Sequence, residues 1–234
     1  NAELINKESA RIKEVYSQRE INFDREIYAQ WQPAEHFILS ERKIAAAMLL
    51  HKEGKFPKPE DKCLEIGYGR LGWLTDLISW GFKETNLCGI ELDAQRAEIA
   101  RQLLPKADLR IGNAANLPWE DNTFNFVVIS TVFSSILSED IRKLIVKEID
   151  RVLKNGGVLI WYDLAVNNPK NPNVKGINAK QLNHLFSMFS IKLKSVTLAP
   201  PITRFVVPKS LAIASILNIF PFLRTHLISI LIKK

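Results

Sequence analysis

A chain of 234 residues, 47% hydrophobic and 24% charged, is long enough to form a substantial domain around a complete core, and this composition argues against disorder, collagen and repeat arrays. The net charge is +7, and we interpret the basic residues as spread along the chain from Lys7 to Lys234, with acidic residues between them. Because no basic block interleaved with aromatic residues is present, nucleic acid is disfavoured as a partner. Cys63 and Cys88 each lie in an apolar run. We therefore expect two buried thiols and a reducing compartment such as the cytoplasm.

Strands and helices are predicted to alternate through the middle of the chain. The N-terminal residues 1–55 precede this region and are expected to be helical. The expected strands are 63–66, 87–91, 107–111, 124–130 and 158–164, with helices at 71–80, 93–103 and 140–153. This order is typical of a parallel sheet with right-handed crossovers.

The pattern changes after the fifth strand. A polar loop at 165–177 and a short helix at 179–189 precede an alternating strand at 191–199. An apolar helix near 209–219 then precedes a last strand near 225–232. Pro221, Arg224 and His226 interrupt this apolar region, so a spanning helix is not expected, while association with a membrane surface stays open.

These elements predict an α/β fold. We expect a Rossmann-like three-layer sandwich, in which five parallel strands are followed by an antiparallel terminal pair, giving a seven-stranded mixed sheet with helices on both faces. Ligands of such sheets bind beyond the carboxyl ends of the strands.

The stretch CLEIGYGRLGWL (63–74) holds the first candidate ligand contacts. Gly67, Gly69 and Gly72 spell G-x-G-x-x-G before a helix N-terminus, which favours a carboxylate or a phosphate. Glu65, two residues before the first glycine, favours a cation. A zwitterionic amino acid meets both demands and a pyrophosphate meets only one, so an amino-acid-bearing nucleoside is favoured over NAD.

The next two strands end in polar residues that suit a nucleoside. Glu91 lies 19 residues after Gly72 and can accept hydrogen bonds from ribose hydroxyls, a contact that NAD and adenosyl ligands share. Asn113 can accept from an exocyclic amine and donate to a ring nitrogen, which suits adenine.

Four segments carry a resemblance to a known family. CLEIGYGRLGWL, GIELD, IGNAANLPWEDNTFNFVVIS and RVLKNGGVLIWYDL, in this order between about Asp61 and Leu164, resemble the class I S-adenosylmethionine-dependent methyltransferases, and within them the branch that acts mostly on small molecules and lipids. The resemblance implies S-adenosylmethionine as cofactor and S-adenosylhomocysteine as product. It implies these cofactor contacts: Glu65 at the methionine ammonium, Gly67, Tyr68, Gly69 and Gly72 in the glycine loop, Glu91 at the ribose, Leu92 beside the adenine, Asn113 and Ala114 at the adenine edge, and Ser130 facing the methionine part.

Two positions depart from the family's commonest pattern. The third glycine comes one residue late, with Leu71 in its usual place, and Asn113 stands where aspartate is more frequent. We expect residues 1–234 to form a single methyltransferase domain. It would comprise a helical cover over the cleft (1–55), a cofactor-binding core (61–164) and an acceptor-side part (165–234) with an apolar insertion at 209–222.

Methyl transfer is an in-line displacement that depends mainly on positioning, and it needs a general base only if the acceptor must first lose a proton. Asp163, at the end of the fifth strand, and His36, in the cover, are the catalytic candidates, whereas His184 is expected to be structural. The stretch Ser130–Phe133 lacks the proline pair typical of enzymes that methylate base amines or glutamine, and no cluster has metal-ligand spacing.

The predicted function is methyl transfer to a small-molecule or lipid-linked acceptor, at oxygen. Tyr28, Trp31, the 167–173 loop and the 209–222 insertion are the expected acceptor walls. An NAD(P)-dependent oxidoreductase and a non-catalytic adenosyl-binding module are the alternatives. The acceptor's identity and the oligomeric state are left open.

Overall fold

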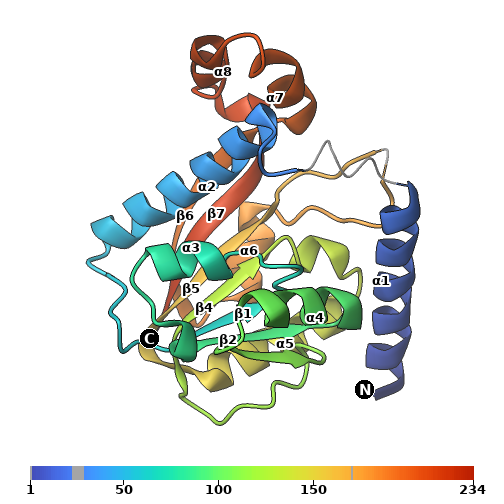
Figure 1. The fold of residues 1–234 in the computed structure, drawn as a ribbon, viewed down its shortest axis with the longest axis vertical. Coiled ribbons are helices and arrows are strands. Elements are labelled where there is room, and N and C mark those ends of the chain that lie inside the picture. The colour runs from blue at the N-terminus through green and yellow to red at the C-terminus, as the bar shows by residue number, and fades with distance from the viewer. Residues whose placement is uncertain (1, 23–28, 170) are drawn as a thin grey trace.

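The computed structural model describes residues 2–22, 29–169 and 171–234, and its centre is a seven-stranded sheet in the order β3-β2-β1-β4-β5-β7-β6 (Figure 1). The strands are β1 (Cys63–Ile66), β2 (Leu87–Glu91), β3 (Asp108–Ile111), β4 (Phe124–Ser130), β5 (Leu153–Leu164), β6 (Phe189–Leu198) and β7 (Arg224–Lys233). The first five pair in parallel, and β7 is antiparallel to both of its neighbours. The predicted fold class is confirmed.

Helices cover both faces of this sheet. They are α1 (Ala2–Asn22), α2 (Pro33–Lys52), α3 (Leu74–Ser79), α4 (Ala94–Leu103), α5 (Glu139–Val152), α6 (Ala179–Leu185), α7 (Pro200–Val206) and α8 (Leu211–Leu217), with short 3-10 turns η1 (Glu84–Asn86), η2 (Phe133–Ser135) and η3 (Pro221–Leu223). Successive residues of β4 face opposite sides. Val127 and Ile129 pack with α5 and α6, whereas Phe126 and Val128 pack with α2, α3 and α4. Burial of both faces explains why the central strands read as continuous apolar runs.

The structure departs from the predicted elements most clearly at α3, β5 and α7. Helix α3 starts at Leu74 rather than at Leu71, because the residues before it make the turn that closes the glycine loop. Strand β5 begins at Leu153, and its pairing with β4 is shifted by an irregularity before Val158. Helix α7 was not predicted; it begins with two prolines, which the first turn of a helix tolerates. Within the described residues, no helix is both long enough and apolar enough to cross a membrane.

Candidate cofactor-binding site

A cavity of about 420 Å³ lies at the carboxyl ends of β1, β2, β3 and β4, a size typical of small-molecule sites. The ten residues predicted to contact a cofactor all line it: Glu65, Gly67, Tyr68, Gly69, Gly72, Glu91, Leu92, Asn113, Ala114 and Ser130. The fold thus brings four separate segments of the sequence to one place. Their individual contacts with a ligand stay predictions.

The glycine loop is folded so tightly that two of its glycines have no room for a side chain. A Cβ on Gly67 would lie 2.5 Å from Cγ2 of Val132, and one on Gly72 would lie 2.0 Å from Oε1 of Glu65. Both also have positive φ, at +70° and +49°. The loop backbone therefore packs directly against the end of β4 and the Glu65 carboxyl group.

Glu65 is the penultimate residue of the buried strand β1 and is only 1% exposed. Both of its carboxyl oxygens accept from the Trp73 amide, at 2.9 Å each. Burial raises the pKa of Glu65 to about 8, against the opposing effects of the Trp73 hydrogen bond and the Arg42 charge. The carboxyl is therefore mostly protonated at neutral pH, and a cation in the cavity would favour its ionised form.

Glu91, at the end of β2, is held by backbone donors. Its Oε2 accepts from the Gly69 amide at 2.8 Å, and its Oε1 accepts from the Asp93 amide at 2.9 Å. A carboxylate has about four acceptor positions, so two remain for ligand hydroxyls. The bond to Gly69 also joins the ends of β1 and β2 into one wall.

The Asn113 amide is already partly engaged. Its Oδ1 accepts from the Ala115 amide at 2.8 Å, and its Nδ2 donates to Oγ of Ser9 at 2.7 Å. One N–H of the amide and one lone pair of its oxygen remain for a base edge. Ser9 belongs to α1, so this helix reaches the part of the cavity where adenine is expected.

Helix α1 forms the outer wall of the cavity, which it lines with Glu8, Ser9, Ile12 and Tyr16. It is tied to the segment after β4: the Leu137 amide donates to Glu8 at 2.6 Å, and Arg11 donates to the Ser135 carbonyl at 2.6 Å. In Figure 1, α1 stands at one side of the sheet, beside α4. The predicted N-terminal cover over the cleft is therefore present, although the sequence does not indicate which residues make it.

Arg42 of α2 also lines the cavity, and sequence reasoning missed it. Its guanidinium carbon lies 4.9 Å from the Trp73 ring centroid and 5.7 Å from that of Tyr162, and Nη1 donates to Oγ of Ser130 at 3.3 Å. Its Nε is buried without a hydrogen-bond partner. Burial lowers the pKa of Arg42 from its ordinary value. Such a cation would be stabilised by an anionic ligand group.

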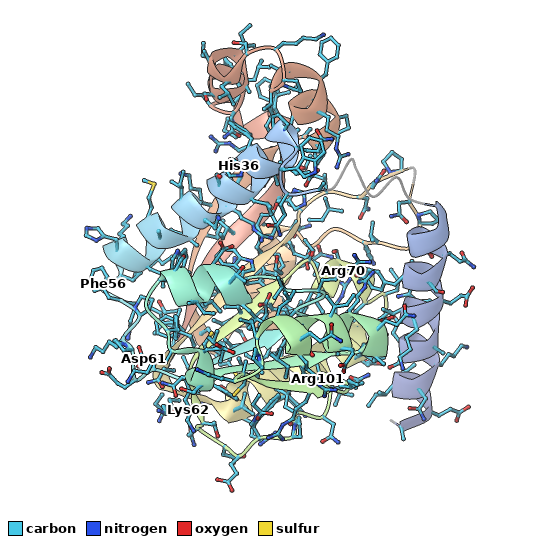
Figure 2. All side chains as sticks on the ribbon, viewed as in Figure 1. His36, Phe56, Asp61, Lys62, Arg70 and Arg101 are labelled. Carbon is cyan, nitrogen blue, oxygen red and sulfur yellow. The ribbon has the colours of Figure 1, made fainter. Side chains whose placement is uncertain are left out.

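The two catalytic candidates lie outside the cavity wall. His36 is exposed near the start of α2, where Figure 2 shows it below α7 and α8. Asp163 is 1% exposed and accepts from the amides of Ser134 (3.0 Å) and Leu164 (2.8 Å), while burial raises its pKa to about 6. This placement does not support a catalytic role for either residue.

The predicted acceptor walls are also mostly elsewhere. Trp31 is 73% exposed and is not part of the wall, although its neighbour Gln30 is. The described residues of the 167–173 segment and the 209–222 segment do not line the cavity. Tyr28 lies outside the described residues. Within the residues that the structure describes, no group of histidine, cysteine and acidic side chains could hold a metal ion.

Comparison with known proteins agrees with this geometry. A family profile described as "Methyltransferase domain" matches residues 64–161. The fold resembles that of an S-adenosylmethionine-dependent methyltransferase of Thermotoga maritima, with a TM-score of 0.61 at 20% identity over 88% of this chain and 95% of that one. The middle of the chain, just under half of its length, therefore matches a methyltransferase domain. The fold is thus that of an S-adenosylmethionine-dependent methyltransferase.

The curated relatives match this chain over part of their length. A sterol 4-C-methyltransferase of Caenorhabditis elegans is 32% identical over 129 residues, which are 53% of this chain and 36% of that protein. A demethylmenaquinone methyltransferase of Bacillus cereus is 30% identical over 111 residues, 45% of this chain and 46% of that protein. The chain thus spans less than half the length of these relatives.

Proposed function

We propose that this chain transfers a methyl group from S-adenosylmethionine to a small-molecule or lipid-type acceptor. The observation that carries the proposal is that an acidic and a basic side chain, Glu65 and Arg42, lie together at one end of the cavity. Glu65 favours a cation there, and Arg42 favours an anion. The amino-acid end of the cofactor offers an ammonium and a carboxylate together.

The remaining wall fits the other parts of the cofactor. Glu91 has acceptor positions left for the ribose hydroxyls, and Leu92 and Asn113 lie where the adenine is expected. Helix α1 forms the outer wall of the cavity and so limits the access of water to the reacting groups. When bound, the cofactor supplies a methyl group that is already activated on a sulfonium.

The proposed acceptor atom is an oxygen that ionises without help from the protein. Among the described residues of the wall there is no histidine, aspartate or lysine. Glu8 is paired with Arg11, and this hydrogen bond holds the pKa of Glu8 below its usual range, which makes Glu8 a weak base. An acidic hydroxyl, such as a phenol or an enol, would therefore suit this site better than an aliphatic alcohol.

The names of the relatives support an acceptor of hydrophobic character. One relative is named for a sterol and another for demethylmenaquinone. The sterol enzyme is named for a carbon atom, so methylation at carbon is the competing outcome. Analysis of the product decides between carbon and oxygen.

The buried acid beside the glycine loop disfavours the oxidoreductase alternative. A dinucleotide would place its pyrophosphate near Glu65, and this anion would gain no ion pair from an acidic side chain, whether protonated or ionised. A non-catalytic adenosyl-binding module would have the same cavity and the same affinity for the cofactor. Turnover alone separates such a module from an enzyme.

The test begins with calorimetric titration of S-adenosylhomocysteine and NADH into the native chain and Glu65→Ala. We expect binding of the first ligand only, weakened by about tenfold or more in the variant, which corresponds to about 1.4 kcal/mol. Glu98→Gln is a control, because Glu98 is an exposed carboxylate outside the cavity wall. If NADH binds, and its affinity is the same for the native chain and Glu65→Ala, the cofactor assignment is overturned.

The second stage tests transfer itself. The chain is incubated with methyl-labelled S-adenosylmethionine and a panel of lipid-like phenols and quinols, and the products are analysed by mass spectrometry. A product with the labelled methyl group bound to oxygen, as a methyl ether, is the expected result. Label on carbon would correct the acceptor atom, and cofactor binding with no transfer to any member of a broad panel would favour the non-catalytic module.

A further inference from the structure

The segment between β6 and β7 forms a separate projection, here called the lobe and defined as residues 200–223. It consists of α7, α8 and η3, and Figure 1 shows it beyond the end of the sheet, beside the start of α2. Its buried apolar contacts are few: Val207 and Ala214 of the lobe pack with Leu198 of β6 and Ala34 of α2. The lobe is therefore attached to the domain through few buried side chains.

The larger apolar side chains of the lobe point outward. Helix α8 has one buried residue, Ala214, while Leu211 and Ile216 on the same helix are exposed. Phe222 is 80% exposed, Phe205 67% and Ile219 66%. The exposed set is Phe205, Leu211, Ile213, Ile216, Ile219, Phe220 and Phe222. An apolar cluster of this kind on a projecting element is typical of an interaction site.

The charge of the surrounding sequence indicates which partner fits. All 25 acidic residues of the chain lie at or before Asp163, whereas ten of its 32 basic residues follow it. The interpretation that acidic residues lie between the basic residues along the whole chain is therefore wrong for its last third. In the lobe, Lys209 is exposed over the Phe205 ring, and the neighbouring acid Glu35 is paired with Arg204 at 2.8 Å. Apolar side chains among cations, with no acid in the segment, complement an anionic lipid surface.

The lobe lies at the same edge of the sheet as the cavity. Strand β7 is antiparallel to β5, and its His226, near the start of the strand, pairs with Leu164 at the carboxyl end of β5. Because the lobe leads directly into β7, it extends beyond the carboxyl edge, where β1 to β4 end at the cavity. A surface that binds the lobe would therefore lie on the side of the molecule where the cavity wall is built.

We propose that the lobe inserts its exposed apolar side chains into the surface of a bilayer that contains anionic phospholipids. The apolar residues enter the interface, and the exposed Lys209 of the lobe faces the lipid phosphates. Membrane attachment would hold the carboxyl edge of the sheet close to lipid-embedded molecules. The proposal concerns binding and does not depend on methyl transfer.

The experiment is cosedimentation of the full chain with lipid vesicles, without cofactor or acceptor. One set of vesicles contains phosphatidylcholine alone, and the other also contains phosphatidylglycerol. We expect binding to the anionic vesicles that weakens with added salt, and clearly weaker binding to phosphatidylcholine. The double variant Ile219→Ser, Phe222→Ser should lower the partition coefficient by about tenfold or more, because two exposed apolar side chains are lost.

Phe56→Ser is the matched control, since Phe56 is 55% exposed and Figure 2 shows it at the opposite end of α2 from the lobe. This variant should bind vesicles like the native chain. Circular dichroism melting curves check that each variant folds, and the lipid and salt comparisons on the native chain need no variant.

Three results would overturn the proposal. The first is no binding to anionic vesicles, or equal binding to both vesicle types. The second is equal loss of binding in Phe56→Ser and in the double variant. The third is a concentration-dependent dimer, seen by light scattering, that the double variant abolishes while vesicles are not bound; the occupant of the lobe would then be a second copy of the chain.

Discussion

Replacing Glu65 with glutamine is expected to make the protein less sensitive to pH near neutrality. The Glu65 carboxyl is buried at the end of β1, and burial raises its pKa from 4.5 to about 8. The folded protein therefore binds this proton more tightly than the unfolded chain does. The resulting loss of stability is absent below pH 4.5, grows as the pH rises, and levels off above about pH 8.

The size of the effect follows from this difference in pKa. Each pH unit between the two pKa values changes the free energy of unfolding by about 1.4 kcal/mol, and the change becomes smaller close to pH 8. Between pH 6 and pH 8 the native chain should lose about 2 kcal/mol through this group. Glutamine keeps the shape and an acceptor for the Trp73 amide but does not titrate in this range.

The assay is urea unfolding of the native chain and Glu65→Gln at pH 6, 7 and 8. Other groups that titrate in this range cancel in the difference between the two proteins. The stability of the variant relative to the native chain should rise by about 2 kcal/mol across the range, whereas Glu98→Gln should show no such trend. If the free energy of unfolding changes equally with pH in Glu65→Gln and in the native chain, the carboxyl is already ionised at pH 6. That result would refute the reasoning.

Four further outcomes are expected. At pH 7, S-adenosylhomocysteine should release a proton from Glu65 on binding, which calorimetry detects as a heat that depends on the buffer; a heat independent of the buffer would contradict this. Gly67→Ala should destabilise the fold by about 2 kcal/mol or more and weaken cofactor binding, while Gly54→Ala, with positive φ but open space, should cost about 1 kcal/mol in urea unfolding. Equal losses of stability in Gly67→Ala and Gly54→Ala would show that backbone strain, and not the close contact at Gly67, destabilises the fold. Arg42→Gln should weaken binding of S-adenosylhomocysteine by about tenfold, and unchanged affinity would remove Arg42 from the site. Asp163→Asn should keep kcat within about twofold, and a loss of about a hundredfold at unchanged cofactor affinity would restore its role as a base.

The parts of the site that the sequence predicted share a local origin. In a parallel sheet, the residue that ends each strand lies at the same edge as its neighbours, so short motifs are enough to place Glu65, Glu91, Asn113 and Ser130 together. The glycine spacing is equally local, because the tight loop forms within a few residues of β1. The strand pattern therefore predicts both the fold and this side of the cavity.

The parts that were missed depend on contacts between distant segments. Nothing in the stretch around Arg42 indicates that α2 crosses the sheet and brings this side chain beside Ser130, 88 residues away. Ser9 meets Asn113 across a separation of 104 residues for the same reason. His36 and Asp163 were selected by residue type and strand position, and side-chain direction and burial placed both outside the wall.

The division between local and distant contacts also separates the two halves of the function. The methyltransferase profile and the motif residues both lie within the middle of the chain, and they account for the wall on the cofactor side. Helix α1, Arg42 of α2 and the lobe lie in flanking segments outside the profile match. For this chain, the selectivity for an acceptor should respond to substitutions in α1, such as Tyr16→Ala, more than to changes in the motif, which should act on cofactor affinity.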